Sequence, residues 1–292
     1  MNKIVAKRFN RRLSKESSNG WFASILIILV TTAYTFGALT NLRLIELAEN
    51  YLSDLRIVLL SPARAQSKRI AVVLIDEKSL AHLPYQSPID RSFIANLISD
   101  LEHRSVVAIG LNVLFNRQTE PDKDDVLYQK LRNVKTPVVI TQISSEAGYS
   151  IEQIEFSKDY LKGLHTGLSL IYRDTSDHTV RVSLLKLYHE GIKELGFASK
   201  IAEILGINLP TEEKISIDYR LGTSPAITPF PIYSASEVTD LPRSALEHRI
   251  VLIGSDLGAS SRLRTPFSLL NDGTANDIPG VIIEAHVLSQ LI

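Results

Sequence analysis

The longest run of apolar residues in the chain extends over residues 21–39 and contains no charged side chain. A helix rises about 1.5 Å per residue, so this run would span roughly 28 Å, close to the thickness of a bilayer's hydrocarbon core. Six cations and a single glutamate precede the run, whereas the segment after it is close to neutral. Because cations favour the cytoplasmic side, the pattern predicts a transmembrane helix at 21–40, a cytoplasmic arm at 1–20 and an extracytoplasmic remainder.

Two other interpretations of this apolar run remain open. A cleaved signal peptide shares the basic start, but its apolar core is usually about 7–15 residues long and ends at a pair of small residues. A buried core helix has a similar composition, but six cations on one side of such a helix are unusual. The long run and its unequal flanks favour an uncleaved anchor in the plasma (inner) membrane, with the main domain in the periplasm or outside the cell.

The apolar pattern continues after the anchor with a different period. Residues 41–60 carry apolar side chains spaced alternately three and four residues apart: Ile45, Ala48, Leu52, Leu55 and Leu59. This spacing is a heptad seam, so a juxtamembrane helix is predicted, and it should end at Ser61-Pro62. The seam is shorter than a coiled-coil assignment requires. It packs either on the chain's own domain or on a second copy, in a homodimer formed through residues 45–59.

After the juxtamembrane helix, apolar strand-like runs alternate with helical patterns. Continuous apolar runs at 69–75, 106–115 and 137–143 are typical of strands that are buried on both faces. Two helical patterns, the first opened by Asp90 and the second by Pro121, separate these runs. This order predicts an α/β fold with a mixed, largely parallel sheet and flanking helices.

The second half of the chain gives weaker patterns. Residues 144–164 predict a long polar loop, and two runs at 167–172 and 180–188 predict an antiparallel pair of strands. A helix at 197–205, a buried strand at 249–253 and an apolar closing helix at 281–292 are expected to follow. No linker is visible after residue 60, so residues 61–292 are expected to form one domain. Three residues of the predicted strands should be fully buried in its sheet: Val72, Val107 and Leu252.

Charge and composition exclude several classes of function. The whole chain has no net charge and its first twenty residues carry +5, so the remainder carries −5 and has no electrostatic attraction for nucleic acid. The absence of cysteine excludes disulfides, thiolate metal sites and a cysteine nucleophile. The sequence contains no phosphate-binding loop and no hydrolase, zinc-protease or dinucleotide motif. We therefore expect no enzyme, no cofactor and no metal site.

Three features are candidates for ligand contacts, and each has a structural alternative. Asp76 ends a buried strand, where ligands of parallel sheets bind, but a residue there also suits capping the next turn or pairing with an arginine. Ser255 lies in a loop with glycines at 254 and 258, which either offers backbone amides to an anion or forms a tight turn. Arg181 lies within a strand pattern and faces either solvent, which the pattern favours, or a buried carboxylate.

The order of the motifs resembles one family of sensory domains. After the anchor come the D-x-R of Asp54–Arg56, a strand that ends in Ile75-Asp76, and a proline-bearing loop that ends at Arg91. Later motifs lie at residues 250–255, 265–266 and 279–281. In this order they resemble the type-two CHASE domain, a sensory extracellular domain of bacterial receptors, over roughly residues 43–292. The resemblance implies further membrane helices and a cytoplasmic cyclase or kinase as output. Neither lies within this sequence, which is either a fragment or a sensor without its own output module.

The sequence departs from that family at positions that carry charge. Asn112 stands where the family has an aspartate, His178 stands at a glycine position before Arg181, and Glu284 replaces a histidine. The loop before Arg91 lacks the family's tryptophan. These changes alter the charge at these points but not the expected fold.

The sequence therefore favours a membrane-anchored sensory domain. Contacts to an unidentified small ligand are expected from five residues: Asp76, Arg91, Asn112, Arg181 and Ser255. A scaffold that binds another envelope protein, and an enzyme of undetected type, are the alternatives. A pocket lined by the first four of these residues would favour the sensor, whereas an apolar patch without a pocket would favour the scaffold.

The closing helix raises one more expectation. It is apolar on nearly every side, and a terminal helix of this kind would expose a costly patch at the surface. If the helix instead continues into a second membrane span, both ends of the domain must face the membrane. Residues 41–50 and 285–292 would then lie on the same side of the domain. Ile292 on the face opposite Leu42 would contradict this arrangement.

Overall fold

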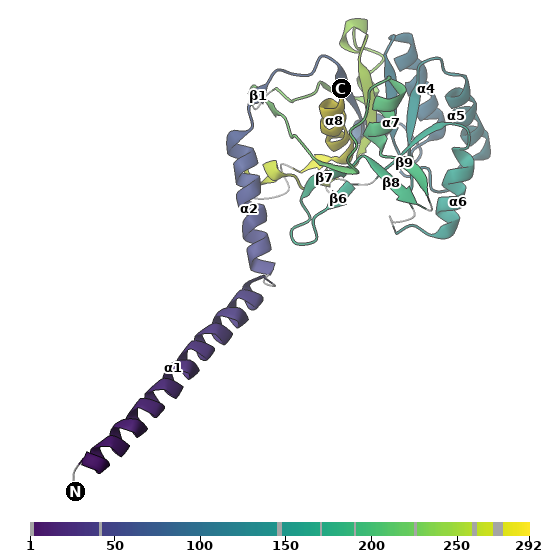
Figure 1. Ribbon diagram of the computed structural model, residues 1–292. Helices are drawn as coiled ribbons and strands as arrows, with labels where there is room; N and C mark the ends of the chain where they lie inside the picture. The colour runs from purple at the N-terminus through teal and green to yellow at the C-terminus, as the bar shows by residue number, and fades with distance from the viewer. Residues whose placement is uncertain are drawn as a thin grey trace. The chain divides into compact units, whose positions relative to one another are not determined.

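The structure is a computed structural model of the chain (Figure 1), and its two compact units are Met1–Ser53 and Asp54–Ile292. It describes residues 3–40, 43–144, 148–169, 171–189, 191–224, 227–258, 262–270 and 277–292.

The first unit contains the apolar helix. α1 is one continuous helix, Lys3–Thr40, and none of its segment Trp21–Leu39 is buried. Among the described residues, this segment is the one helix long and apolar enough to cross a membrane. By its length, composition and position near the N-terminus, it suits a membrane anchor or a signal sequence.

The next helix, α2 (Arg43–Leu60), ends before Ser61 as predicted. Two of its faces differ in exposure. Leu59 of the heptad seam is 71% exposed, whereas Asp54 is buried. Both residues belong to the unit that contains the sheet, so this end of the seam is not covered by the chain's own domain.

Six strands form the main sheet, in the order β12-β2-β13-β3-β4-β5. In that order their bounds are Ile232–Ser234, Ile70–Asp76, Ile250–Asp256, Ala108–Asn112, Val138–Gln142 and His165–Leu168. Every neighbouring pair is parallel. The predicted α/β fold with a largely parallel sheet is therefore confirmed.

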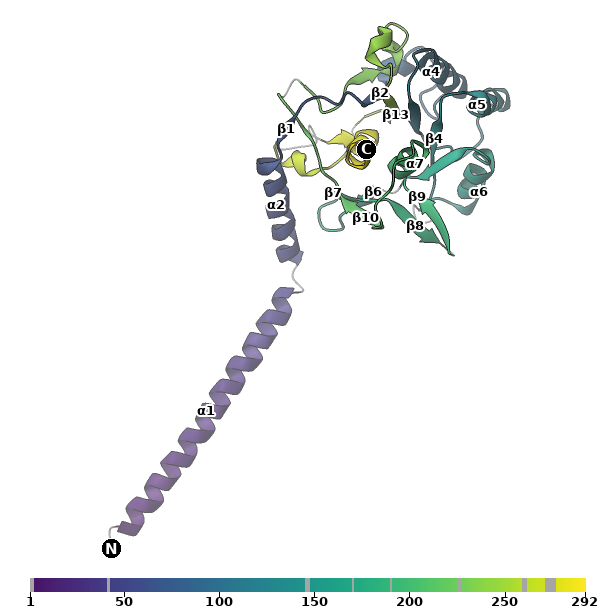
Figure 2. The ribbon, with the colours of Figure 1, turned by 45° about the horizontal axis from the view of Figure 1, so that its top comes forward.

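Helices cover both faces of this sheet (Figures 1 and 2). On one side lie α4 (Arg91–His103), α5 (Pro121–Asn133) and α6 (Ile151–Tyr160), and on the other α7 (Phe197–Ile204) and α8 (Gly280–Leu291). Successive residues of β2 point alternately into the two cores, Ala71 and Val73 into one and Ile70 and Val72 into the other. Strands covered on both faces need apolar residues at every position, which explains their continuous apolar runs.

Two strand glycines let the helices of the second side approach closely. A Cβ atom on Gly110 would lie 2.6 Å from the side chain of Leu252 and 2.8 Å from that of Ile201 in α7. A Cβ atom on Gly254 would lie 2.4 Å from Cβ of Val281 in α8. Side chains at these two positions would push α7 and α8 away from the sheet.

Short strands form four smaller sheets beside the main one. They are β1 (Ala63–Arg64) with β11 (Leu221–Gly222); β6 (Ile171–Arg173), β7 (Val180–Leu184) and β10 (Lys214–Ser216); β8 (Lys186–His189) with β9 (Ile192–Leu195); and β14 (Arg262–Leu263) with β15 (Ile278–Pro279). β6 and β7 pair in the predicted antiparallel sense. The predicted run at 167–172 is divided, because its first residues belong to β5 of the main sheet.

The structure corrects two local predictions. Val107 is 41% exposed because β3 begins one residue later, at Ala108, whereas Val72 and Leu252 are fully buried as expected. Residues 144–164 are not simply a loop, because α6 lies within them and Ser150 caps it. The apolar residues of α6 do not fall on one face, because Ile151 and Ile154 lie on one side of the helix and Phe156 and Tyr160 on another, so no apolar stripe predicts it.

The closing helix, α8 (Gly280–Leu291), lies where it was predicted, but its surroundings differ from the expectation. All residues of α8 from Val281 to Leu288 are buried in the second core. A helix that is apolar all round belongs in a core, so α8 exposes no costly patch, and the reason for expecting a return to the membrane disappears. Leu42, on which the geometric part of that expectation depends, lies outside the described residues.

Candidate functional site

The carboxyl edge of the main sheet brings together three of the five predicted contact residues. Asp76 is the last residue of β2 and Asn112 the last residue of β3, and Ser255 stands next to last in β13, which lies between them. In the strand register Asp76 pairs with Asp256, and Asn112 pairs with Gly254. This is the edge at which open α/β sheets bind ligands.

Asp76 at this edge acts as a helix cap. Its Oδ1 accepts hydrogen bonds from Ser79 N at 2.9 Å and Ser79 Oγ at 2.6 Å, and it also accepts one from Ser234 Oγ at 3.0 Å. Ser79 belongs to the short helix α3 (Glu77–Leu80), so the capping alternative is confirmed. Partial burial disfavours the charge, but the hydrogen bonds from Ser79 and Ser234 lower the pKa of Asp76.

The other two positions at this edge, Asn112 and Ser255, have different surroundings. Asn112 Nδ2 is buried and has no hydrogen-bond partner among the described residues. Beside Ser255, Asp256 forms an ion pair with Arg262 at 2.8 Å. The loop after β13 therefore presents a carboxylate and a guanidinium that neutralise each other.

Arg91 is satisfied entirely inside the protein. It is the first residue of α4 and is 2% exposed. Its Nε donates to Asp124 Oδ1 at 3.2 Å, and its guanidinium lies 4.5 Å from the centre of the Phe115 ring. Asp124 also accepts hydrogen bonds from the backbone and hydroxyl of Thr119, each at 2.8 Å. These contacts give Arg91 a structural role between α4 and α5.

Arg181 is the centre of a larger ion cluster. Its Nε and Nη2 donate to the two oxygens of Asp54 at 2.7 and 2.6 Å, and its Nη1 and Nη2 donate to the two oxygens of Asp177 at 3.0 and 2.6 Å. Asp174 lies 3.5 Å from Nη1. The solvent-facing prediction for Arg181 is therefore wrong, and its alternative, a buried carboxylate, is confirmed by Asp54. We call Asp54, Asp174, Asp177 and Arg181 the Arg181 cluster.

The Arg181 cluster joins parts of the chain that are far apart in the sequence. Asp54 comes from α2, Arg181 from β7, and Asp177 from the turn before β7. Burial disfavours the charge on Asp177, but hydrogen bonds from Arg181 and from Thr179 N lower the pKa of Asp177 to about 2. His178, at the family's glycine position in this turn, adopts φ 61°, the left-handed conformation that glycine favours.

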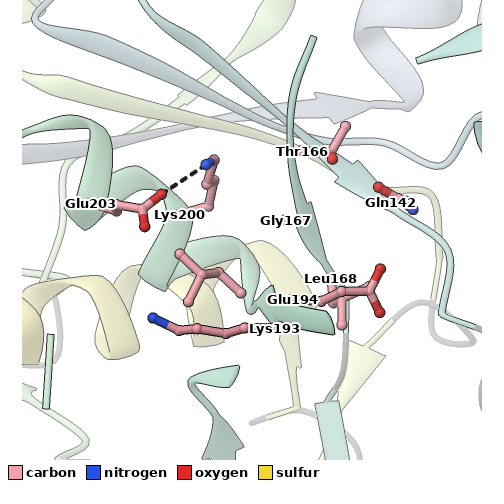
Figure 3. Close-up of a pocket in the computed structure, with 9 residues that line it drawn as sticks. Gln142, Thr166, Gly167, Leu168, Lys193, Glu194, Lys200 and Glu203 are labelled. Carbon is pink, nitrogen blue, oxygen red and sulfur yellow. Dashed lines mark hydrogen bonds and ion pairs between the residues drawn. The ribbon is translucent and has the colours of Figure 1, made fainter. Parts of the chain in front are cut away.

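Within the described residues, none of the three cavities is lined by a predicted contact residue. The main chain of Arg117, a few residues after β3, accepts a hydrogen bond from Arg91 Nη2 at 3.4 Å, so Arg91 lies near the edge that holds Asn112. Arg181 belongs to a separate three-stranded sheet. Other residues line all three cavities, and Figure 3 shows the cavity beside the last residues of β4 and β5. The assignment of ligand contacts to Asp76, Arg91, Asn112, Arg181 and Ser255 stays a prediction.

Sequence reasoning missed two buried titratable groups on α8. Glu284 and His286 are each 4% exposed. Burial raises the pKa of Glu284 to about 8, although the backbone N–H of Ala198 opposes the shift. Burial, together with the charge of Arg220, lowers the pKa of His286 to about 3. The replacement of a family histidine by Glu284 was the one signal available in the sequence.

Sequence reasoning also did not identify the partner of Arg181. Asp54 was identified as part of a D-x-R motif, but nothing in the sequence linked it to a residue 127 positions away. The structure supplies that link. It joins the end of α2 that belongs to the same unit as the sheet to β7.

Fold and site define a three-layer α/β domain behind an apolar N-terminal helix. The family model described as the CHASE2 domain matches residues 25–292, and the chain belongs to this family. CHASE2 is a non-catalytic sensory domain, typically extracytoplasmic in signalling receptors. A search of curated proteins and a search of solved structures each gave no significant match.

Proposed function

We propose that this chain is the sensory part of a membrane-anchored bacterial receptor. Residues 1–20 lie in the cytoplasm, the helix at 21–39 lies in the bilayer, and Asp54–Ile292 lies outside the cytoplasm. The unequal charge on the two sides of the apolar helix supports this orientation. The observation that carries the proposal is the Arg181 cluster, because it fastens the sensory domain to α2, the helix next to the anchor.

The geometry of the cluster suits a mechanical connection. Two bidentate contacts, to Asp54 and to Asp177, fix the guanidinium of Arg181 in position and direction. A stimulus that displaces β7 must therefore either carry Asp54 and α2 with it or break the contact. Packed interfaces change between discrete arrangements, so a small displacement of β7 becomes a shift of α2.

The partners that this function requires are the lipid bilayer and a second copy of the chain. Ile45, Leu52 and Leu59 of the heptad seam expose 38%, 58% and 71% of their surface. Their spacing suits knobs-into-holes packing against the same seam of another copy, and a membrane anchor would hold both copies in one plane. The seam faces away from Asp54, so dimer contact and ion cluster use different faces of α2.

Single-cysteine variants test this function, because the natural chain contains no cysteine. Lys158→Cys places a thiol on the exposed side of α6. A membrane-impermeant maleimide should label it in intact spheroplasts, and should label a cysteine within residues 1–20 only after permeabilisation. The reverse labelling pattern would refute the orientation.

The same cysteine-free background tests the connection through Arg181. Leu52→Cys should form a disulfide-linked dimer in membranes, and Arg181→Gln should change the yield of that dimer because α2 is no longer fixed at Asp54. Arg173→Gln, an exposed arginine of β6, serves as the matched control and should leave the yield unchanged. Equal yields in all three backgrounds would show that the cluster does not control α2.

A further inference from the structure

A short segment, residues 216–222, joins three parts of the domain, and we call it the strap. Its first residue, Ser216, ends β10, which pairs with β7. Its last two residues form β11, which pairs with β1. β1 begins three residues after the end of α2 (Figure 1). The strap therefore leads from the sheet that contains Arg181 to the strand that follows α2.

Two side chains of α8 hold the strap by its main chain. Gln290 Oε1 accepts a hydrogen bond from Asp218 N at 3.0 Å, and Gln290 Nε2 donates to Ser216 O at 3.1 Å. One turn earlier on the same face of α8, His286 Nδ1 accepts from Arg220 N at 3.1 Å. These bonds fall on alternate residues of the strap. The two side chains thus take the place that a neighbouring strand has in a sheet.

The strap residues between these hydrogen bonds are buried in the second core. Ile217 and Tyr219 are 5% and 2% exposed. The hydroxyl of Tyr219 donates to Val180 O at 2.8 Å, and its ring packs edge-on against that of His286, with centroids 5.1 Å apart. Because both the main chain and a buried side chain of the strap contact α8, a shift of α8 changes the support on which the strap lies.

The strap and the Arg181 cluster begin at the same residue. Ile217 N donates to the main-chain oxygen of Arg181 at 2.9 Å, whereas the Arg181 side chain binds Asp54 of α2. At the other end of the strap, Arg64 of β1 forms an ion pair with Asp218 at 2.9 Å. The end of α2 is therefore connected to the domain at two points, at Asp54 and at β1 just beyond its last residue.

The two connections differ in strength. The Arg181 cluster consists of bidentate contacts between charged groups, which are the stronger kind. The strap is held on α8 by hydrogen bonds between neutral groups, and its ion pair with Arg64 is partly exposed and therefore weak. Within the described structure, no other element packs extensively on residues 54–60. The strap is the connection that opens more easily.

We propose that the strap is a releasable connection through which α8 controls the direction of α2. With the strap docked on α8, the end of α2 is held both at Asp54 and at β1. With the strap released, α2 pivots about the Arg181 cluster, which stays intact. The effect of this pivot on a second copy of the chain rests on the sensory function proposed above. The coupling of α8 to β1 does not rest on it and is measured separately.

Hydrogen–deuterium exchange of the full chain in nanodiscs tests this coupling. Gln290→Ala removes two of the hydrogen bonds at an exposed residue, so the chain should still fold. The amides of residues 61–66 should then exchange about fivefold faster or more, the expected effect of losing two hydrogen bonds between neutral groups. Gln129→Ala, which truncates an exposed glutamine of α5, is the matched control and should leave this exchange unchanged.

The coupling must also act in the opposite direction, because linkage is reciprocal. A Cβ atom on Gly222 would lie 1.6 Å from Ile227 O, so Gly222→Ala displaces the far end of the strap. Exchange in the last turn of α8, residues 288–292, should then become faster. Unchanged exchange of residues 61–66 in Gln290→Ala, or of residues 288–292 in Gly222→Ala, would overturn the proposal.

The Leu52→Cys dimer separates this proposal from the sensory function. Gln290→Ala should change the yield of the disulfide-linked dimer, whereas Gln129→Ala should not. An unchanged yield together with faster exchange of residues 61–66 would show that the strap does not control α2, and would overturn the proposal at that step. Absence of the dimer in the otherwise natural chain would count against the sensory function instead, and the coupling of α8 to β1 would stand on the exchange data.

Discussion

The two sides of the main sheet bury ionisable side chains in opposite ways. On the side of α4 and α5, Arg91 and Asp124 remain charged and neutralise each other across 3.2 Å. On the side of α7 and α8, Glu284 and His286 have no ion-pair partner in the described structure, and burial shifts both pKa values toward the neutral form. A charge in a protein core is costly unless it is paired with an opposite charge or the group takes its neutral form, and this domain shows both cases.

Because of this difference, the two sides lead to different predictions for stability. On the side of α4 and α5, the buried carboxylate of Asp124 lies beside the guanidinium of Arg91, so opposite charges compensate each other there. On the other side the charge of Glu284 depends on pH around neutrality, because the pKa of this carboxyl is raised to about 8. Three predictions follow from this contrast, in order of decreasing effect.

The largest effect is expected from breaking the ion pair. Arg91→Leu leaves Asp124 buried without its cation, which should lower the free energy of unfolding by about 3–5 kcal/mol. The double variant with Asp124→Leu replaces the pair by apolar side chains and should recover much of that loss, because neither charge then remains unpaired. Chemical denaturation of both variants measures the two values. A single variant within about 1 kcal/mol of the natural protein would mean that Asp124 is satisfied by Thr119 alone.

The second prediction concerns Glu284 and the pH dependence of stability. The folded protein holds this proton up to about pH 8, whereas the unfolded chain releases it near the ordinary value of 4.5. Stability contributed by the protonated group is therefore complete below pH 4.5 and is lost as the pH rises to about 8. Between pH 6.5 and 8 the free energy of unfolding should fall by up to about 1.4 kcal/mol per pH unit.

Glu284→Gln provides the control for this prediction. Glutamine has nearly the same shape but cannot ionise, so the decline above pH 6.5 should disappear. Thermal or chemical unfolding at several pH values distinguishes the two proteins. A decline of equal slope in the glutamine variant would assign the pH dependence to other groups.

The elements of the domain differ in how far the sequence could predict them. Strands β2 and β13 were predictable because residues buried on both faces produce continuous apolar runs. Helix α6 was missed because its exposed position requires no apolar face. The environment of Glu284 was missed because an apolar helix at the end of a sequence looks the same whether it lies in a core or on a surface.

The sequence could indicate where the contact residues lie along the chain's elements, but not which residues they pair with. The strand pattern placed Asp76 at the end of a strand and Ser255 in the loop after another. The structure includes Ser255 in β13, ends β3 at Asn112, and makes all three residues neighbours at one edge of the sheet. The pairing of Arg181 with Asp54 depends on how α2 and β7 pack, and local sequence patterns carry no information about that contact.

The smallest effect, and the sharpest test of the contrast, is expected from His286. Its Nδ1 accepts a hydrogen bond from Arg220 N at 3.1 Å, and its ring packs edge-on against Tyr219 and Phe230 with centroids 5.1 and 4.9 Å away. The folded state keeps this histidine neutral down to about pH 3, whereas the unfolded chain protonates it near 6.5. Its contribution to stability is present above pH 6.5 and is lost as the pH falls toward 3. Between pH 4.5 and 6.5 this gain with rising pH should cancel the loss from Glu284, which gives a flat profile.

His286→Gln removes one of the two opposing slopes. At pH 7 the variant should lose at least about 1 kcal/mol, because the edge-on contacts of the ring with Tyr219 and with Phe230 both disappear. Its stability should then decline continuously from pH 4.5 to 8, where the natural protein is flat up to 6.5. Unfolding measured at half-unit pH intervals resolves the two profiles. A flat profile retained in the variant would show that Glu284 and His286 are not the opposing pair, because a single remaining slope cannot cancel itself.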